Sequence, residues 1–142
     1  MTYATQQDLI VRFGERELIQ RTDRALPQTT IDTDVVARHL GDAEALVDGY
    51  LAKAATLPLA AIPPALTKVT CDIARYYLWG ETAERDGPVH RAHGEALRWL
   101  RDVADGRIRL DVGGEPVAQP GGGAVSYSGA DRVFSRDTLR GM

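Results

Sequence analysis

The sequence predicts a mainly α protein, a small helical bundle with a short β-strand or hairpin and an extended C-terminal arm. Two observations carry this prediction. Apolar residues recur at helical spacing over 32–54, 64–79 and 88–106, and Pro or Gly clusters separate these segments. At 142 residues we expect one domain with appendages. The division is a helical body at 1–106, a strand with a Gly/Pro-rich linker or hairpin at 107–130, and a docking arm at 131–142.

The first helix is predicted to begin after Thr5, because Thr5 and Asp8 form a variant of the capping box. Its apolar face consists of Leu9, Ile10 and Phe13. Gly14 can end this helix. Residues 15–21 read as a further helical turn, and 24–30 as a loop that contains a proline.

The strongest helical pattern begins at Asp32 or Thr33, either of which can cap it. Its stripe, spaced by three and four residues, is formed by Val36, Leu40, Ala43, Val47, Tyr50 and Ala54. Gly41 and Gly49 lie within this predicted helix, and each lowers helix stability by roughly 1 kcal/mol relative to Ala. Small residues at these positions would permit the close approach of another helix.

Prolines between residues 57 and 64 stop this helix, because proline lacks the N–H donor and fixes φ. Pro64 is suited to the first position of the next helix, which should end at Gly80. Its stripe is Leu66, Val69, Ile73, Tyr76 and Tyr77. Pro88 opens the last helix, which Gly106 can cap. The stripe of that helix is Val89, Ala92, Ala96, Leu97, Leu100 and Val103.

Residues 107–112 alternate between polar and apolar side chains, which predicts a short strand with Ile108, Leu110 and Val112 on one face. A lone strand has unpaired edges, so it needs a partner. The best candidate is 125–127, after the Gly-rich segment.

The end of the chain combines a predicted linker with a peptide suited to binding a protein surface. Residues 113–123 are rich in Gly and Pro, and the residues after 131 carry apolar and cationic side chains that a solvated tail does not need. The candidate docking residues are Arg132, Val133, Phe134, Arg136, Leu139 and Arg140. This arm would dock on its own body, on a sister subunit or on a different protein.

Charge and composition limit the functional classes that the sequence favours. The net charge of −3 gives no argument for nucleic-acid binding. Only two of the 17 Lys and Arg residues are Lys, which fits either an interface role for arginine or a coding bias. The single cysteine, Cys71, permits no disulfide within the chain. No apolar run is long enough for a membrane span, and we expect a soluble chain made in the cytoplasm.

Two groups of side chains are candidates for sites of chemistry. His90 and His93 lie three residues apart on a helix, where they could hold a metal together with Asp86 or Glu95. Two solvent-facing histidines are the simpler interpretation, since a third well-spaced ligand is absent. Tyr76, Tyr77 and Trp79 could stack on bases, yet core packing or a subunit contact is favoured because no cationic patch surrounds them. No catalytic, cofactor-binding or metal site is therefore assigned.

Taken together, the order and spacing of several segments resemble the Mu-like prophage head–tail adaptor proteins of tailed phages. The matching segments are Tyr3–Gly14, Glu17–Asp23, Ala43–Ala52, Leu57–Leu59, Pro63–Leu78, Ala96–Gly106 and Arg132–Gly141. One departure is Ala54-Ala55-Thr56, where members of the family often have an aromatic residue or an Arg-Tyr pair. No single motif is decisive.

The resemblance implies a non-enzymatic structural protein of the virion, located at the head–tail junction and made in the bacterial host cytoplasm. Such a connector forms a ring beneath the portal, twelvefold in the virion, and extends the DNA channel. Its partners would be the portal protein, the next neck or tail-completion protein and its own sister subunits. DNA would pass without sequence-specific binding, and no cofactor or membrane is implied. The alternative is a nucleic-acid-binding phage packaging or regulatory protein, although the turn at 57–64 is too long and Pro-rich for a helix-turn-helix.

Overall fold

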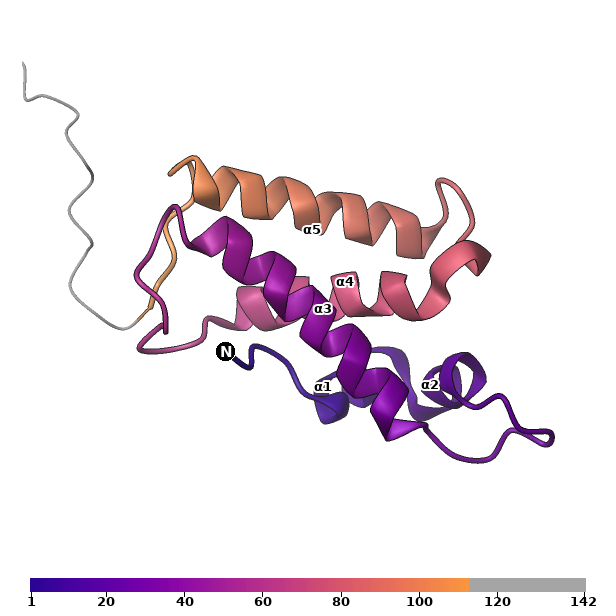
Figure 1. Cartoon of the computed structure of the whole chain (residues 1–142). Coiled ribbons are helices and arrows are strands. Elements are labelled where there is room, and N and C mark those ends of the chain that lie inside the picture. The colour runs from indigo at the N-terminus through magenta and orange to yellow at the C-terminus, as the bar shows by residue number, and fades with distance from the viewer. Residues whose placement is uncertain (113–142) are drawn as a thin grey trace, which may run out of the picture.

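The structure, a computed structural model, describes residues 1–112, and these form five α-helices and one short 3₁₀ helix (Figure 1). In chain order they are α1 (Gln6–Phe13), α2 (Glu15–Thr22), α3 (Thr33–Leu51), α4 (Pro64–Trp79), η1 (Gly80–Thr82) and α5 (Pro88–Ala104). The mainly α fold class is confirmed.

Helices α3, α4 and α5 pack against one another and form the centre of the bundle. Figure 1 shows α3 crossing diagonally over α4, while α5 runs beside α4. Helices α1 and α2 contact each other and lie against α4, with α1 also contacting α3. Helices α1 and α2, residues 6–22, therefore form a second layer on one side of the central helices.

The core is built from the apolar stripes that the sequence indicates. The largest side chains with almost no exposure are Leu9, Leu18, Leu51, Leu66, Ile73, Leu100, Val36, Val47 and Val103. Helix α3 ends at Leu51, earlier than its stripe suggests. Ala54, the last member of that stripe, lies in the following turn and still packs against the core.

Helix ends follow the capping residues. At α1 the Thr5 hydroxyl accepts from the Asp8 amide (3.3 Å), and the Asp8 carboxylate accepts from the Thr5 amide (2.8 Å), which completes a capping box. At α3 it is Asp32 that caps, since its carboxylate accepts from two backbone amides of the first turn. Gly80, with φ of +51°, ends α4 in a conformation that favours glycine.

The predicted strand at 107–112 is not formed. The alternation is real, because Ile108, Leu110 and Val112 pack against the core while the residues between them are exposed. The apolar side chains are thus covered by helices, and the segment needs no paired strand for their burial. Two of its backbone amides, at 107 and 108, donate to the Asp102 carbonyl instead. The candidate partner, 125–127, lies outside the described residues.

Gly41 and Gly49 do not mark a close approach of helices within the body. Both are exposed on α3, and a Cβ atom built on either would meet nothing within 4 Å. The space beside them is open in the part of the chain that the structure describes. None of the described helices is both long and apolar enough to cross a membrane.

Candidate protein-interaction surface

The six arm residues predicted from the sequence, from Arg132 to Arg140, lie outside the described residues, as do most of the 107–130 segment and its Gly-rich part. The docking arm therefore stays a prediction. The described body offers two further features that bear on contact with other proteins, an aromatic hollow and a braced loop.

Aromatic rings gather where the end of α4 meets α3 and α5. Tyr76 stacks on His93, with ring centroids 3.9 Å apart and planes 8° from parallel. His90 approaches Tyr76 edge-on at 6.1 Å. His39, from α3, lies 6.5 Å from Tyr77. All three histidines of the chain thus surround one pair of tyrosines.

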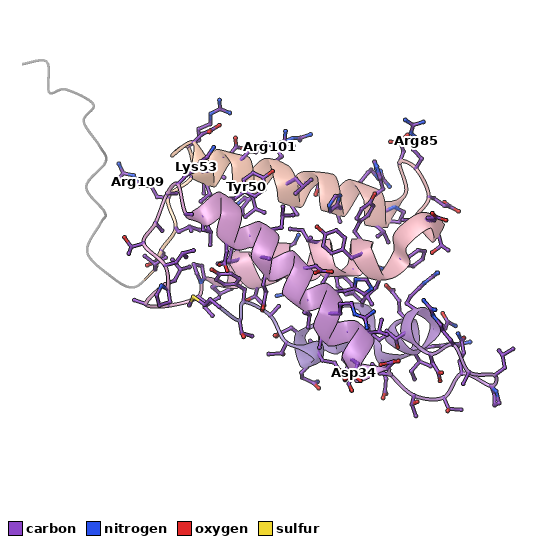
Figure 2. The ribbon with its side chains drawn as sticks, in the orientation of Figure 1. Asp34, Tyr50, Lys53, Arg85, Arg101 and Arg109 are labelled. Atoms are coloured by element: carbon purple, nitrogen blue, oxygen red, sulfur yellow. The ribbon has the colours of Figure 1, made fainter. Side chains whose placement is uncertain are left out.

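An open hollow of about 640 Å³ lies beside these rings. This aromatic hollow is lined by His39, Asp42, Tyr76, Tyr77, Gly80 and Glu81. In Figure 2, the label Asp34 marks the start of α3, and the label Arg85 marks the connection between η1 and α5. The lining contains two carboxylates, two tyrosine rings and no Lys or Arg, so it favours the binding of a cationic or apolar group.

Burial shifts the pKa of two members of this cluster, His93 and Tyr77. It lowers the pKa of His93, and the charge of neighbouring His90 lowers it further. Burial raises the pKa of Tyr77, with a smaller contribution from the Asp42 carboxylate. The Nδ1 atom of His39 is buried and has no hydrogen-bond partner within residues 1–112. His93 is thus held in its neutral form around pH 7.

The histidines do not form a metal site in the described body. His93 is occupied by its stack on Tyr76, and His90 meets the same ring. Within residues 1–112, no three side chains of the His, Cys, Asp or Glu type lie close enough together to hold a metal ion.

Trp79 does not belong to this cluster, although the sequence places it beside the tyrosines. Its indole N–H donates to Glu17 on α2 (2.8 Å). Arg75 donates two hydrogen bonds to the same carboxylate, at 2.7 and 2.9 Å. Arg21 lies over the indole ring at 3.6 Å from its centroid. These contacts fasten α2 to α4 and give Trp79 a structural role.

Glu17 is held ionised by this arrangement. Burial raises the pKa of Glu17, but hydrogen bonds from Arg75 and Trp79 and the charges of Arg75 and Arg21 outweigh burial, so the pKa lies below its usual value. Sequence reasoning missed this pair because the residues are 58 positions apart. An acidic residue in a short amphipathic helix gives no signal of its distant partner.

The loop between α2 and α3 is braced by Asp23, which is the second feature that sequence reasoning missed. The Asp23 carboxylate accepts from the amides of Ala25 (2.9 Å), Thr29 (2.9 Å) and Thr30 (3.2 Å). Gln28 donates to the carbonyl of Asp23 at 2.7 Å. The braced loop, residues 23–30, therefore has a defined shape. Its only sequence signal is an Asp at the end of a helix before a Pro-containing turn.

The N-terminal residues are also tied down. The Tyr3 hydroxyl donates to Asp48 on α3, and the Tyr3 amide donates to Glu44 at 2.8 Å. Tyr3 is only 2% exposed. This anchor fixes the path by which the chain enters α1.

These features define a small helical-bundle protein whose described surface combines an acidic, aromatic hollow with an ordered and exposed loop. Residues 3–127 match the family described as "Bacteriophage Mu, Gp36". The match covers most of the sequence, so the chain belongs to this family of phage proteins.

Two curated relatives agree with the family match. The chain is 32% identical over 137 residues to "Gene product J" of Escherichia phage Mu, and the alignment covers 96% of each chain. It is 29% identical over 141 residues to "Mu-like prophage FluMu protein gp36" of Haemophilus influenzae, covering 99% of this chain and 97% of the relative. The similarity extends over the full length, including the segment after residue 112.

Proposed function

We propose that this chain is a structural protein of the virion, a head–tail connector that forms a ring beneath the portal and extends the DNA channel. The observation that carries the proposal is the full-length similarity to proteins of phage Mu and a Mu-like prophage. The helical bundle supports it, because such a body presents several amphipathic faces to neighbours.

A closed ring needs contacts between two different surfaces of adjacent copies. The described body supplies distinct surfaces in the aromatic hollow and the braced loop. The predicted arm adds a third element. Its last eleven residues, 132–142, would span roughly 35 Å when extended, which is enough to reach a neighbouring protein. A net charge of −3 also suits a conduit through which DNA slides without being held.

Particle imaging tests the location. A tagged copy of this chain in a phage or induced prophage should appear at the junction of capsid and tail, in a ring that matches the portal. Absence of the chain from finished particles would overturn the proposal. Tight, strongly salt-dependent binding of duplex DNA by the purified chain would instead favour a packaging or regulatory role.

The contribution of the arm is tested separately, with purified portal. Deletion of 131–142 should leave thermal unfolding of the body unchanged and abolish joining to the portal. A finer test replaces Phe134 and Leu139 together by Ala, with Ser135 and Thr138 replaced by Ala as the matched control. Only the first pair should weaken assembly, because Phe and Leu supply the apolar anchors. Normal assembly by the truncated chain would show that the arm is not the docking element.

A further inference from the structure

The tip of the braced loop exposes a large apolar side chain, while hydrogen bonds hold the backbone of the loop in place. Leu26 is 92% exposed, although residues 23–30 are held by the Asp23 carboxylate and by Gln28. Arg24 and Pro27, beside it, are exposed as well. Because the loop is already ordered, a contact at its tip would cost little further conformational entropy.

The aromatic hollow complements this tip in charge and in apolar character. It is open to solvent, and its volume of about 640 Å³ leaves room for a leucine side chain. The rings of Tyr76 and Tyr77 offer an apolar wall for a leucine. Asp42 and Glu81 offer exposed carboxylates that an arginine can pair with.

We propose that the braced loop of one copy inserts Leu26 into the aromatic hollow of a second copy, with Arg24 facing Asp42 and Glu81. The loop does not fill the hollow of its own chain, since Leu26 remains exposed there. The contact joins two different surfaces, so it can repeat from copy to copy around a ring. It rests on the proposed connector function, for which it supplies the contact between sister subunits.

Disulfide trapping tests the contact directly. Ala25→Cys keeps both Leu26 and Arg24. Asp42→Cys places a thiol at the hollow, where Glu81 remains to pair with Arg24. The native Cys71 is fully buried and does not compete. A mixture of the two single variants at high concentration, alone and assembled with portal, should form a mixed disulfide dimer under mild oxidation. The matched control replaces Asp42→Cys by Ala37→Cys, an exposed position on α3 about 140° away around the helix axis.

The outcomes decide the proposal. A mixed dimer with Asp42→Cys and little with Ala37→Cys supports it. Equal trapping by both partners, or none with either in both preparations, overturns it. The chain that carries both Ala25→Cys and Asp42→Cys gives a second readout. A ladder of cross-linked species shows that the contact repeats around a ring, whereas a product that stops at the dimer supports the contact but not its use in a ring.

A second variant removes the apolar anchor without relying on thiols. Leu26→Asp should weaken self-association, or ring formation on the portal, by about tenfold or more. Val11→Asp is the matched control, because Val11 on α1 is also a strongly exposed apolar residue at 76%. Equal behaviour of the two variants would overturn the proposal.

The contact and the connector function fail in different ways. If the unmodified chain joins the portal yet no specific disulfide forms, the loop-in-hollow contact is wrong and the connector function stands. If the disulfide forms specifically in a chain that is absent from virions, the contact stands and the connector function fails.

Discussion

Replacing Glu17 by Gln removes the negative charge that pairs with Arg75 and leaves the side-chain shape almost unchanged. The two side chains are 20% and 23% exposed, so the pair is largely shielded from water. In the wild type, the Glu17 carboxylate accepts three hydrogen bonds, two from Arg75 and one from Trp79. The amide of Gln has one acceptor oxygen. Its NH₂ group is itself a donor and would face the N–H groups of Arg75 or Trp79.

The expected loss in the free energy of unfolding is about 2 kcal/mol. Hydrogen bonds to charged groups are worth about 1.5–3 kcal/mol, and removing one partner of a buried ion pair costs about 3–5 kcal/mol. Partial exposure and the one acceptor that Gln retains reduce the cost to the lower end. With a denaturant slope of about 2 kcal/mol per M, the midpoint in urea should fall by about 1 M.

The assay is urea unfolding of Glu17→Gln beside Glu15→Gln, an exposed carboxyl in the same first turn of α2. Both Gln variants lose the favourable interaction of a carboxylate with the helix dipole, so the difference between them reports the contacts of Glu17. A double-mutant cycle with Arg75→Met should give a coupling of about 1 kcal/mol or more. Equal midpoints for the two Gln variants would refute the idea that this pair fastens α2 to α4.

The pKa of Glu17 gives the pH dependence of the same effect. Since the folded-state pKa lies below the unfolded value of 4.5, the stabilisation is present above that value. It is lost as pH falls from 4.5 through the folded pKa, so the wild type and Glu17→Gln should converge in acid.

Three further predictions concern single positions. Gly41→Ala should raise the free energy of unfolding by about 0.5–1 kcal/mol, because the position is exposed, helical and open, and thermal unfolding measures the gain. A lower stability would show that the helix needs glycine there. The pKa of His93 is lowered by burial and by His90, so the folded state should lose stability as pH falls from about 6.5 towards the folded pKa, and His93→Gln should flatten that slope in urea unfolding at several pH values. An unchanged slope would contradict the burial of a neutral ring. Burial raises the pKa of the Cys71 thiol to about 11, so a thiol reagent at pH 8 should modify it only after denaturant is added. Rapid labelling of the native chain would contradict this packing.

Much of the helical body could be predicted from local patterns. The limits of α4, from Pro64 to Trp79, follow from a proline that suits the first turn and a glycine that adopts positive φ. The capping box of Thr5 and Asp8 likewise depends on residues three apart. Such interactions can be read from a sequence because both partners are neighbours.

The contacts that shape the surface could not be predicted in this way. The prediction of a strand at 107–112 was wrong, because alternation shows which side chains are buried but not which element buries them. The hollow joins residues of α3, α4 and η1, and the Glu17 pair joins α2 to α4. Each depends on how helices cross, which the spacing of apolar residues along one helix does not specify.

The extended segment at 107–112 has a consequence for everything that follows it. Ile108, Leu110 and Val112 press the chain onto the bundle, so residues 113–142 begin from a fixed point on the body. For the tether predicted from the sequence, the effective concentration of the arm at a target surface would therefore fall with that target's distance from Val112. Replacing the three apolar residues by Ser would release 107–112 from the body and lengthen the reach of the predicted tether without altering a residue of the predicted arm.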